Sequence, residues 1–464
     1  MCETVLFIQF SFRLFRAYLV KSLCFIRKLK QKERLCVFFV SAAGTVLLKN
    51  DGPMLPLQLP RDGSLSDESK QVTIAVIGHE ASSPTVVGGG SGHVTPANLS
   101  SPLAAIRHRA GVVGNASCNA AGTVCVVFQD VTSARDVAAA VTLAQSATYT
   151  LVFVATSSEE GIDRYNLTLT NPCQSTDSGA CTNPLAAVDQ DELVHAVVGA
   201  AGARTAVVAV CPGALLTPWA DKAAAVLIAF LPGQAYGEAI ASILFGDFSP
   251  SARLPVTFPT PDGQQTFPPA AYPGLTNGSA ALPIPVSCNF KCPLNGSAVY
   301  EEKLLVGYRW FDAHNISPAF CFGHGLSFST FSYSGLAVTP SDECQQDGRE
   351  WLAAGTTMGS GLAAMIARVS FKLTNSGKVA ATDVPQLYLT FPTAAGEPPK
   401  QLKGFAPRTL AAGASISVAF NLTARDVSTW DVATHGWLVQ KGAFGVSVGA
   451  SSCDLRLNGS FTIH

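Results

Sequence analysis

The feature that most constrains the fold is a series of short apolar runs separated by segments of helix length. These runs, expected as strands, cover residues 71–78, 123–128, 206–210 and 223–230, together with the run that begins at Leu151. Runs rich in Val, Ile and Ala are typical of strands buried on both faces. Helices are expected between and after them at residues 101–110, 134–147, 189–201 and 235–244. This alternation predicts a mainly parallel α/β sandwich domain over residues 41–260.

Beyond residue 260 the pattern changes. Residues 261–340 are expected to form a connector, which begins rich in Pro, Gly, Ser and Asn and continues with an aromatic, glycine-rich segment from Tyr300 to Phe331. We expect that aromatic segment to pack between domains, and contact of Tyr308, Arg309 and Trp310 with a ligand is the less favoured alternative. From Ala367 onward, strand patterns and turn signals follow one another without an intervening helix. Residues 341–464 are therefore expected to form an all-β sandwich of the immunoglobulin or fibronectin type III kind.

The N-terminal segment, residues 1–40, differs from the rest in charge. It holds eight Lys and Arg against two Glu, a balance of +6, whereas the whole chain has a net charge of −1 and the remainder therefore −7. An acidic body argues against a nucleic-acid partner. The longest uncharged stretch, Thr4 to Phe12, is too short to span a bilayer. A signal-anchor, a basic amphipathic surface helix and sequence foreign to the mature protein all remain open for this segment.

Two kinds of residue point to the secretory pathway. Eight Asn-X-Ser/Thr glycosylation acceptors occur, at Asn98, Asn115, Asn166, Asn277, Asn295, Asn315, Asn421 and Asn458. The cysteines suit disulfides better than a zinc site, because no His-rich pattern surrounds them. The candidate pairs are Cys118/Cys125, Cys173/Cys181, Cys288/Cys292 and the distant Cys344/Cys453. Cys211 follows an apolar run and is expected to be a small buried side chain.

The stretch from Leu151 to Leu169 carries the candidate chemistry. It begins as a buried strand and then breaks into small and acidic residues, among them Glu159 and Glu160. In open α/β sheets, ligands bind beyond the carboxyl ends of the strands, so a carboxylate at this point is well placed to react. Glu160 is the candidate. The competing interpretation is a solvated acidic loop.

A glycine-rich segment, residues 88–96, follows the first buried strand. It lacks the Gly-Lys-Ser/Thr of a phosphate loop and a clean GxGxxG, so nucleotide binding is not expected. The glycines are expected to let the backbone approach a small polar ligand or another domain. For His93 and His324, both in glycine-flanked loops, a loop hydrogen bond is favoured over catalysis, and His93 is kept as a candidate sugar contact.

Several stretches in order resemble glycoside hydrolase family 3, in its secreted β-glucosidase and β-xylosidase branch. They cover residues 45 to about 462 and include TVLLKNDGPMLPL, IAVIGHEASSPTVVGGGSGHVTP, SSEEGIDRYNLTL, PWADKAAAVLIAFLPGQAYGEAIASILFGDFSPSARLPVTFP and YEEKLLVGYRWFDAHNISPAFCFGHGLSFSTF. The resemblance implies an α/β sandwich followed by a fibronectin type III-like domain. It also implies exo-acting hydrolysis of terminal β-linked glucose or xylose, with no metal or organic cofactor.

The resemblance further implies that Glu160, in the E-G-x-D-R motif, is the catalytic acid/base, with Asp163 and Arg164 completing the motif as candidate substrate contacts. Ile162 stands where the family usually has an aromatic residue. A glycosidic oxygen is a poor leaving group and must be protonated as its bond breaks, which suits a carboxyl at this place. The residues alone favour a structural pairing of Asp163 with Arg164 or with neighbouring backbone.

One departure from the family decides what to expect of the chain alone. Family members normally begin with an (α/β)8 barrel that supplies the nucleophilic aspartate, and residues 1–40 are too few for a barrel, which needs about 200 residues. A retaining glycosidase needs two carboxyls. Little or no glycosidase activity is therefore expected from this chain alone. A non-catalytic glycan-binding or interaction protein is the alternative function, and a barrel supplied by a separate chain is a third.

Overall fold

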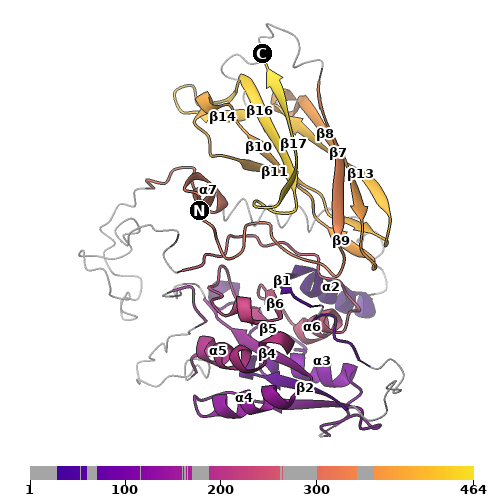
Figure 1. The fold of residues 1–464 in the computed structure, drawn as a ribbon. Helices are drawn as coiled ribbons and strands as arrows, with labels where there is room; N and C mark the ends of the chain where they lie inside the picture. The colour runs from indigo at the N-terminus through magenta and orange to yellow at the C-terminus, as the bar shows by residue number, and fades with distance from the viewer. Residues whose placement is uncertain are drawn as a thin grey trace, which may run out of the picture.

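The computed structural model describes residues 29–52, 54–59, 71–114, 116–158, 160, 164, 166–169, 188–261, 264, 300–341 and 360–464. It shows an α/β domain with a β-sandwich stacked above it (Figure 1). Between the two lies a connector that carries the short helix α7 (Tyr308–Ala313). The predicted fold class, a mainly parallel α/β sandwich followed by an all-β sandwich, is confirmed.

The α/β domain is built on a six-stranded sheet with strand order β1-β6-β5-β4-β2-β3. Its first strand, β1, pairs antiparallel with β6, and every other neighbouring pair is parallel. The carboxyl ends of the five parallel strands therefore lie at one edge of the sheet. The strands are β1 (Thr45–Asn50), β2 (Val72–Ile77), β3 (Val124–Gln129), β4 (Tyr149–Ala155), β5 (Thr205–Val210) and β6 (Ala225–Ala229).

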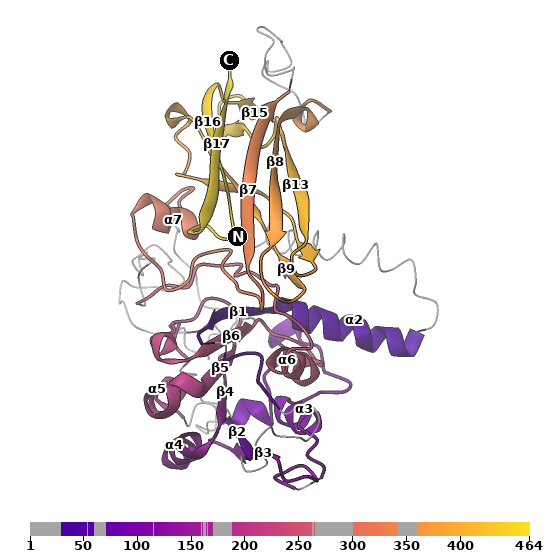
Figure 2. The same cartoon turned by 45° about the vertical axis from the view of Figure 1, so that its right-hand side comes forward.

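Helices cover both faces of this sheet, which explains why its central strands are mostly apolar. In β4, Leu151 and Phe153 point into one core, whereas Val152 and Val154 point into the other. The first core is covered by α3 (Pro102–Arg109) and α6 (Tyr236–Leu244), the second by α4 (Asp136–Ser146) and α5 (Gln190–Ala201). The helix α2 (Leu29–Gly44) runs alongside α6 at the level of β1 (Figure 2).

The β-sandwich encloses a third core between two main sheets, ordered β13-β8-β7 and β11-β10-β16-β17. Its first strand, β7, lies in the segment expected as connector but pairs with β8. The strands of these sheets are β7 (Phe331–Pro340), β8 (Met365–Asn375), β10 (Gln386–Thr390), β11 (Gln401–Phe405), β13 (Ser415–Thr423), β16 (Gly442–Gly449) and β17 (Leu455–Ile463). The small ladders are β9 (Ala381–Asp383) with β12 (Arg408–Leu410) and β14 (Ser428–Asp431) with β15 (Gly436–Val439).

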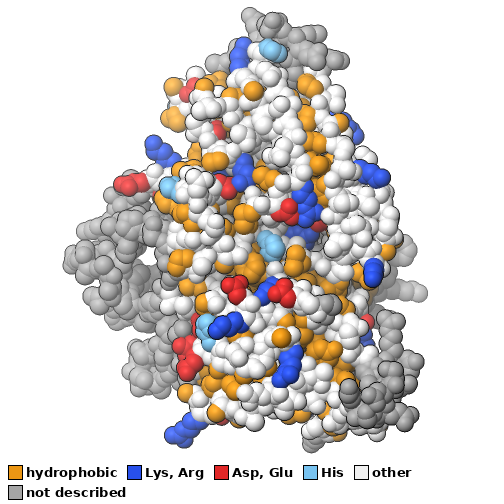
Figure 3. Space-filling model, viewed as in Figure 1, with side chains coloured by type: hydrophobic (Ala, Val, Ile, Leu, Met, Phe, Trp, Pro, Cys, Tyr) orange, Lys and Arg blue, Asp and Glu red, His pale blue; other side chains and the backbone are white. Residues whose placement is uncertain are grey.

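Single-turn 3₁₀ helices punctuate the connections between these elements. They are His79–Ala81, Gly90–Gly92, Gly202–Arg204, Ala220–Lys222, Ser360–Ala363 and Thr393–Ala395. Charged side chains of both signs are interspersed over the face of the molecule shown in Figure 3. None of the described helices is both long and apolar enough to cross a bilayer.

The aromatic connector packs between the domains, as predicted. The Tyr308 ring stacks on Phe322, with 4.8 Å between centroids, and its hydroxyl accepts a 2.8 Å hydrogen bond from the amide of Leu402 in β11. A buried ion pair also crosses the junction, from Arg253 to Asp383, which accepts a second hydrogen bond from the Tyr333 hydroxyl. The sandwich is thus tied to the α/β domain by both aromatic and ionic contacts.

Two disulfides join described cysteines. Cys118–Cys125 is confirmed. The expected pairing of Cys344 with Cys453 is wrong, because Cys453 is bonded to Cys321 of the connector, which the junction brings to a Cα–Cα distance of 6.1 Å. Disulfides are typical of proteins from oxidising compartments. The candidate pairs Cys173/Cys181 and Cys288/Cys292 lie outside the described residues, and Cys211 is buried and unpaired, as expected of it.

Candidate functional site

Glu160 lies in the loop that follows β4, beyond the carboxyl edge of the parallel sheet. The strand ends at Ala155, which pairs with the last residue of β5. The Glu160 side chain is exposed to solvent. The strand pattern therefore predicted its place at the rim of the sheet correctly, whereas its chemical role stays a prediction. The neighbouring candidates Glu159 and Asp163 lie outside the described residues.

The glycine-rich loop lies directly against Glu160. The amide of Ser91 donates a 2.7 Å hydrogen bond to Oε2 of Glu160. Gly90 has φ +71°, and a Cβ added there would lie 2.4 Å from the Cβ of Glu160. Only glycine combines this left-handed conformation with so close an approach. The glycine-rich loop thus makes a close backbone approach, as expected, but its partner here is the loop that carries Glu160, which was not among the expected partners.

The contacts of Glu160 favour its ionised form. The hydrogen bonds from Ser91 lower the pKa of the Glu160 carboxyl, and its weak desolvation opposes them only in part. Exposure to water and a hydrogen bond accepted from an amide N–H both stabilise the charged form of a carboxylate. In this arrangement Glu160 is ready to accept a proton, but it does not hold one at neutral pH.

His93 belongs to the same glycine-rich loop as Gly90 and Ser91. Its side chain is exposed, and its Nδ1 lies 3.2 Å from the carbonyl oxygen of Gly88. This is the loop hydrogen bond favoured for it from the sequence. Its proposed contact with a sugar stays a prediction.

Arg164 connects the Glu160 loop to the segment that follows β5. Its guanidinium donates a 2.9 Å hydrogen bond to the carbonyl of Ala214, and the amide of Leu216 donates a 2.7 Å bond to the carbonyl of Leu167. Burial raises the pKa of the nearby Cys211 thiol to about 12, although the charge of Arg164 opposes this shift. Arg164 therefore holds backbone in the described structure, and its role as a substrate contact is untested.

Ser91 is the residue at this site that sequence reasoning missed. Its contribution is a backbone amide, and any non-proline residue carries one, so its residue type gives no signal. The motif GGGSG did give an indirect signal. A glycine run after a buried strand indicated a close approach, although the partner of that approach was not evident.

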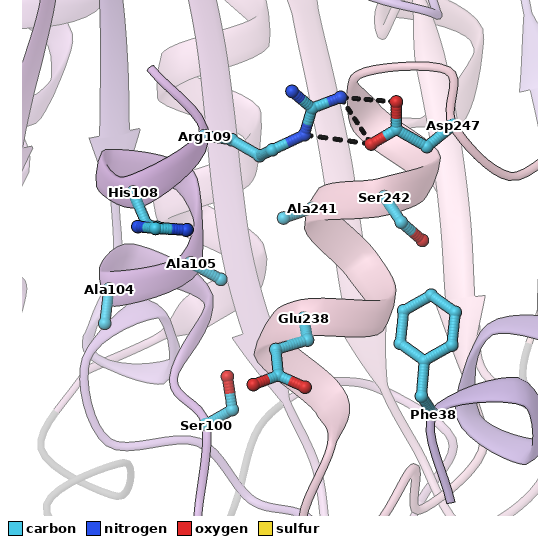
Figure 4. Close-up of a pocket in the computed structure, with 10 residues that line it drawn as sticks. All are labelled: Phe38, Ser100, Ala104, Ala105, His108, Arg109, Glu238, Ala241, Ser242 and Asp247. Carbon is cyan, nitrogen blue, oxygen red and sulfur yellow. Dashed lines mark hydrogen bonds and ion pairs between the residues drawn. The ribbon is translucent and has the colours of Figure 1, made fainter. Parts of the chain in front are cut away.

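Two hollows of the surface lie away from Glu160. A groove of about 450 Å³ lies between α2, α3 and α6 (Figure 4). It is lined by Phe38, Ser100, Ala104, Ala105, His108, Arg109, Glu238, Ala241, Ser242 and Asp247, with an Arg109–Asp247 ion pair at one end. None of these ten residues belongs to the Glu160 loop or to the glycine-rich loop.

The second hollow, of about 440 Å³, lies at the domain junction beside His324. His324 Nε2 lies 2.8 Å from the carbonyl oxygen of Leu48, and burial lowers the pKa of this imidazole. His324 therefore makes the loop hydrogen bond favoured for it. Within the described part of the chain, no cluster of three or more His, Cys, Asp or Glu is placed to hold a metal ion.

The sequence matches the models of two known domain families. The C-terminal domain of glycosyl hydrolase family 3 matches residues 45–327, which is more than half of the chain. The chain belongs to glycosyl hydrolase family 3. A fibronectin type III-like domain matches residues 383–452 of this family 3 chain. Both results agree with the resemblance read from its ordered motifs.

Among the proteins similar to this family 3 chain are several named as β-glucosidases. "Probable beta-glucosidase D" of Aspergillus flavus is 32% identical over 438 residues, which are 90% of this chain and 52% of that protein. A beta-D-glucoside glucohydrolase from Trichoderma reesei is 30% identical with a TM-score of 0.71, covering 94% of this chain and 56% of that one.

DesR, a β-glucosidase from Streptomyces venezuelae solved in complex with D-glucose, is 26% identical with a TM-score of 0.73, covering 94% of this chain and 61% of that one. The chain thus spans about half the length of the curated relatives that it matches.

Proposed function

We propose that this chain supplies the acid/base part of an exo-acting β-glucosidase-like hydrolase, with Glu160 as the acid/base. The observation that carries the proposal is the position of Glu160, whose carboxylate lies beyond the carboxyl end of β4 and accepts a 2.7 Å hydrogen bond from Ser91. Ligands of open α/β sheets bind at this edge. The substrate class is a terminal β-linked glucose or xylose, of which glucose is supported by the β-glucosidase relatives.

Hydrolysis of a glycosidic bond requires two proton transfers from or to Glu160, one after the other. It must protonate the glycosidic oxygen as the bond breaks, and it must then remove a proton from the attacking water. The exposed, hydrogen-bonded carboxylate suits the second task. For the first, its pKa must rise, and burial against a further protein surface is the ordinary way to raise the pKa of a carboxyl.

We therefore expect the complete site to include a second domain that faces this rim. A retaining mechanism needs a nucleophilic carboxylate about 5–5.5 Å from the acid/base. The family resemblance implies that an (α/β)8 barrel provides it. By itself the chain is expected to show little or no turnover, because the nucleophilic carboxylate is expected from the barrel and because the exposed Glu160 has a lowered pKa.

The same observation favours a second candidate function. A carboxylate that is ionised at neutral pH and open to water can accept hydrogen bonds from sugar hydroxyls without protonating a leaving group. A non-catalytic glycan-binding or interaction protein is the alternative.

An assay of the 464-residue chain with an aryl β-glucoside, with and without a purified barrel domain from a related enzyme, tests both functions. Turnover that requires the barrel and disappears in Glu160→Gln, but not in Glu238→Gln, is the expected result. Glu238 is a suitable control because it is also an exposed glutamate and lies on α6. Turnover retained in Glu160→Gln overturns the proposal. Saturable glucose binding without turnover, whether or not the barrel is present, establishes the alternative.

A further inference from the structure

The loop that carries Glu160 is closed at its base by one buried side chain. Gln190, the first residue of α5, is 4% exposed. Its Oε1 accepts a 3.0 Å hydrogen bond from the amide of Ala155, and its Nε2 donates to the carbonyl of Ala155 at 2.7 Å and of Leu169 at 3.1 Å. Ala155 is the last residue of β4 and Leu169 stands at the far end of the loop. A single side-chain amide thus binds both ends.

The next residue completes this closure. Asp191 accepts a 2.8 Å hydrogen bond from the amide of Leu169 through Oδ2 and a 2.9 Å bond from the indole of Trp219 through Oδ1. Leu169 and Trp219 are both fully buried. The N–H and the C=O of Leu169 are therefore both bound by side chains from the first turn of α5. Buried polar groups satisfied in this way rigidify the structure around them.

Glu160 lies between Ala155 and Leu169 in the sequence, and Gln190 holds the backbone at both of these residues. The carboxylate of Glu160 makes a separate contact with the amide of Ser91, which belongs to another segment of the chain. Ala155 precedes Glu160 by only five positions, so a shift of the backbone at Ala155 can displace Glu160 relative to Ser91.

We propose that Gln190 is the positioning residue for Glu160, and that Asp191 supports it. Gln190 acts through the loop and touches no reacting atom. The importance of this role for catalysis rests on the proposed function, whereas the positioning itself does not depend on substrate. A displacement of about 1 Å at a reacting group can reduce a rate by about a hundredfold, so a fixed loop base matters even far from the sugar.

The test is the titration of Glu160, read from the backbone amide of Ser91 in a ¹⁵N-labelled, deuterated sample of the full chain. Because this amide donates to the Glu160 carboxylate, its chemical shift follows the charge of that carboxylate. In Gln190→Leu, which removes all three hydrogen bonds, we expect the titration midpoint to rise towards that of an unperturbed glutamate. We also expect the Ser91 amide to exchange at least tenfold faster with solvent.

Asn375→Leu is the matched control. Asn375 is a fully buried amide in the β-sandwich, and it too binds backbone of separate segments, the carbonyls of Val379 and Leu410. Loss of these hydrogen bonds in Asn375→Leu should lower the melting temperature but leave the titration read from the Ser91 amide unchanged. A merely structural role of Gln190 predicts the same result for both variants. Asp191→Asn, which keeps one acceptor oxygen, is the second variant in case Gln190→Leu does not fold, and it should shift the midpoint less.

An unchanged midpoint and exchange rate in folded Gln190→Leu, or in Asp191→Asn if the first does not fold, overturn the inference. These measurements need no substrate. The positioning role therefore fails or stands independently of the barrel-dependent assay, in which Glu160→Gln tests the proposed function.

Discussion

The amide of Ser91 and the carboxylate of Glu160 are 2.7 Å apart, although 69 positions separate them in the sequence. This contact joins the glycine-rich loop after β2 to the loop after β4, and the two strands are neighbours in the sheet. It holds the candidate acid/base at the rim and keeps it charged. The first prediction below concerns the loops that meet here.

Gly90→Ala should displace Glu160. The left-handed φ of +71° costs a non-glycine residue about 1–2 kcal/mol, and the new Cβ would overlap the Cβ of Glu160 at 2.4 Å. Gly413→Ala is the control, since Gly413 has φ +74° with nothing within 4 Å of the added Cβ. In urea unfolding, Gly90→Ala should lower the free energy of unfolding more than Gly413→Ala does. Only Gly90→Ala should change the titration of Glu160. Equal effects of both variants would contradict the close contact.

Glu80 should make stability depend on pH. Its side chain is buried, and burial raises its pKa from 4.5 to about 7 despite hydrogen bonds from Thr85. Between these pH values the folded chain holds a proton that the unfolded chain has released, so the free energy of unfolding falls as the pH rises. The loss across this window is on the order of 3 kcal/mol.

Glu80→Gln keeps an amide that can both accept from and donate to Thr85, and it cannot ionise. Urea unfolding at several pH values between 4.5 and 7 should show a flatter dependence for this variant than for the wild-type chain. The exposed-residue variant Glu238→Gln should retain the wild-type slope. Parallel curves for Glu80→Gln and wild type would show that Glu80 does not titrate in this range.

Arg253→Met should weaken the junction between the domains. The side chains of Arg253 and Asp383 are 10% and 4% exposed, so loss of the cation leaves a buried carboxylate with Tyr333 as its remaining described hydrogen-bond donor. Breaking such a pair costs about 3–5 kcal/mol. Calorimetry should show a lower melting temperature, and the two domains should begin to melt separately.

The exposed Arg109–Asp247 pair provides the comparison, because its side chains are 42% and 51% exposed. Arg109→Met should cost at most about 1 kcal/mol. Similar losses in the two variants would mean that the junction pair contributes no more than a surface pair.

Cys453→Ser should destabilise the protein more than Cys118→Ser. The Cys321–Cys453 bond spans 132 positions and Cys118–Cys125 spans 7. A disulfide reduces the conformational entropy of the unfolded chain, and this effect grows with the length of the loop that the bond closes. The expected stabilisation of the folded state is about 5 kcal/mol for the long loop and about 2.5 kcal/mol for the short one. Denaturant unfolding of the two variants measures the difference. A greater loss from Cys118→Ser would show that local packing, rather than loop closure, dominates.

Secretion should add glycans at the exposed acceptors. Among the described acceptor asparagines, Asn98, Asn315, Asn421 and Asn458 are exposed and Asn166 is partly buried. Expression through a eukaryotic secretory pathway, followed by an enzyme that removes N-glycans and by peptide mass spectrometry, should reveal glycans at the four exposed sites. Secreted protein that carries no glycan at any of these four sites would contradict this expectation.

Much of the α/β domain could be predicted because its residues carry local patterns. The run from Leu151 to Ala155 is apolar at every position, which is typical of a strand that is covered on both faces. Glu160 could be placed at the rim for the same reason, since it follows that run directly. The expected helix at 189–201 also agrees with α5 (Gln190–Ala201).

The contacts that give the site its geometry could not be predicted in this way. Ser91 binds Glu160 through a backbone amide, and the hydrogen bonds from Gln190 to the backbone of Ala155 depend on where α5 meets the sheet. Cys321 and Cys453 meet because the connector folds against the turn between β16 and β17. Each of these is a tertiary relationship, and the local pattern around each residue does not encode its partner.

The junction has a consequence for engineering the molecule. The sandwich is linked through Cys321 and Arg253, and the connector at Leu326 bridges to Leu47 in β1, the edge strand of the sheet. Glu160 follows β4, with β6 and β5 between it and that edge. The connector is therefore attached to the sheet with two strands between it and β4, so a variant engineered at the junction should alter the stability of the chain without a direct contact to Glu160.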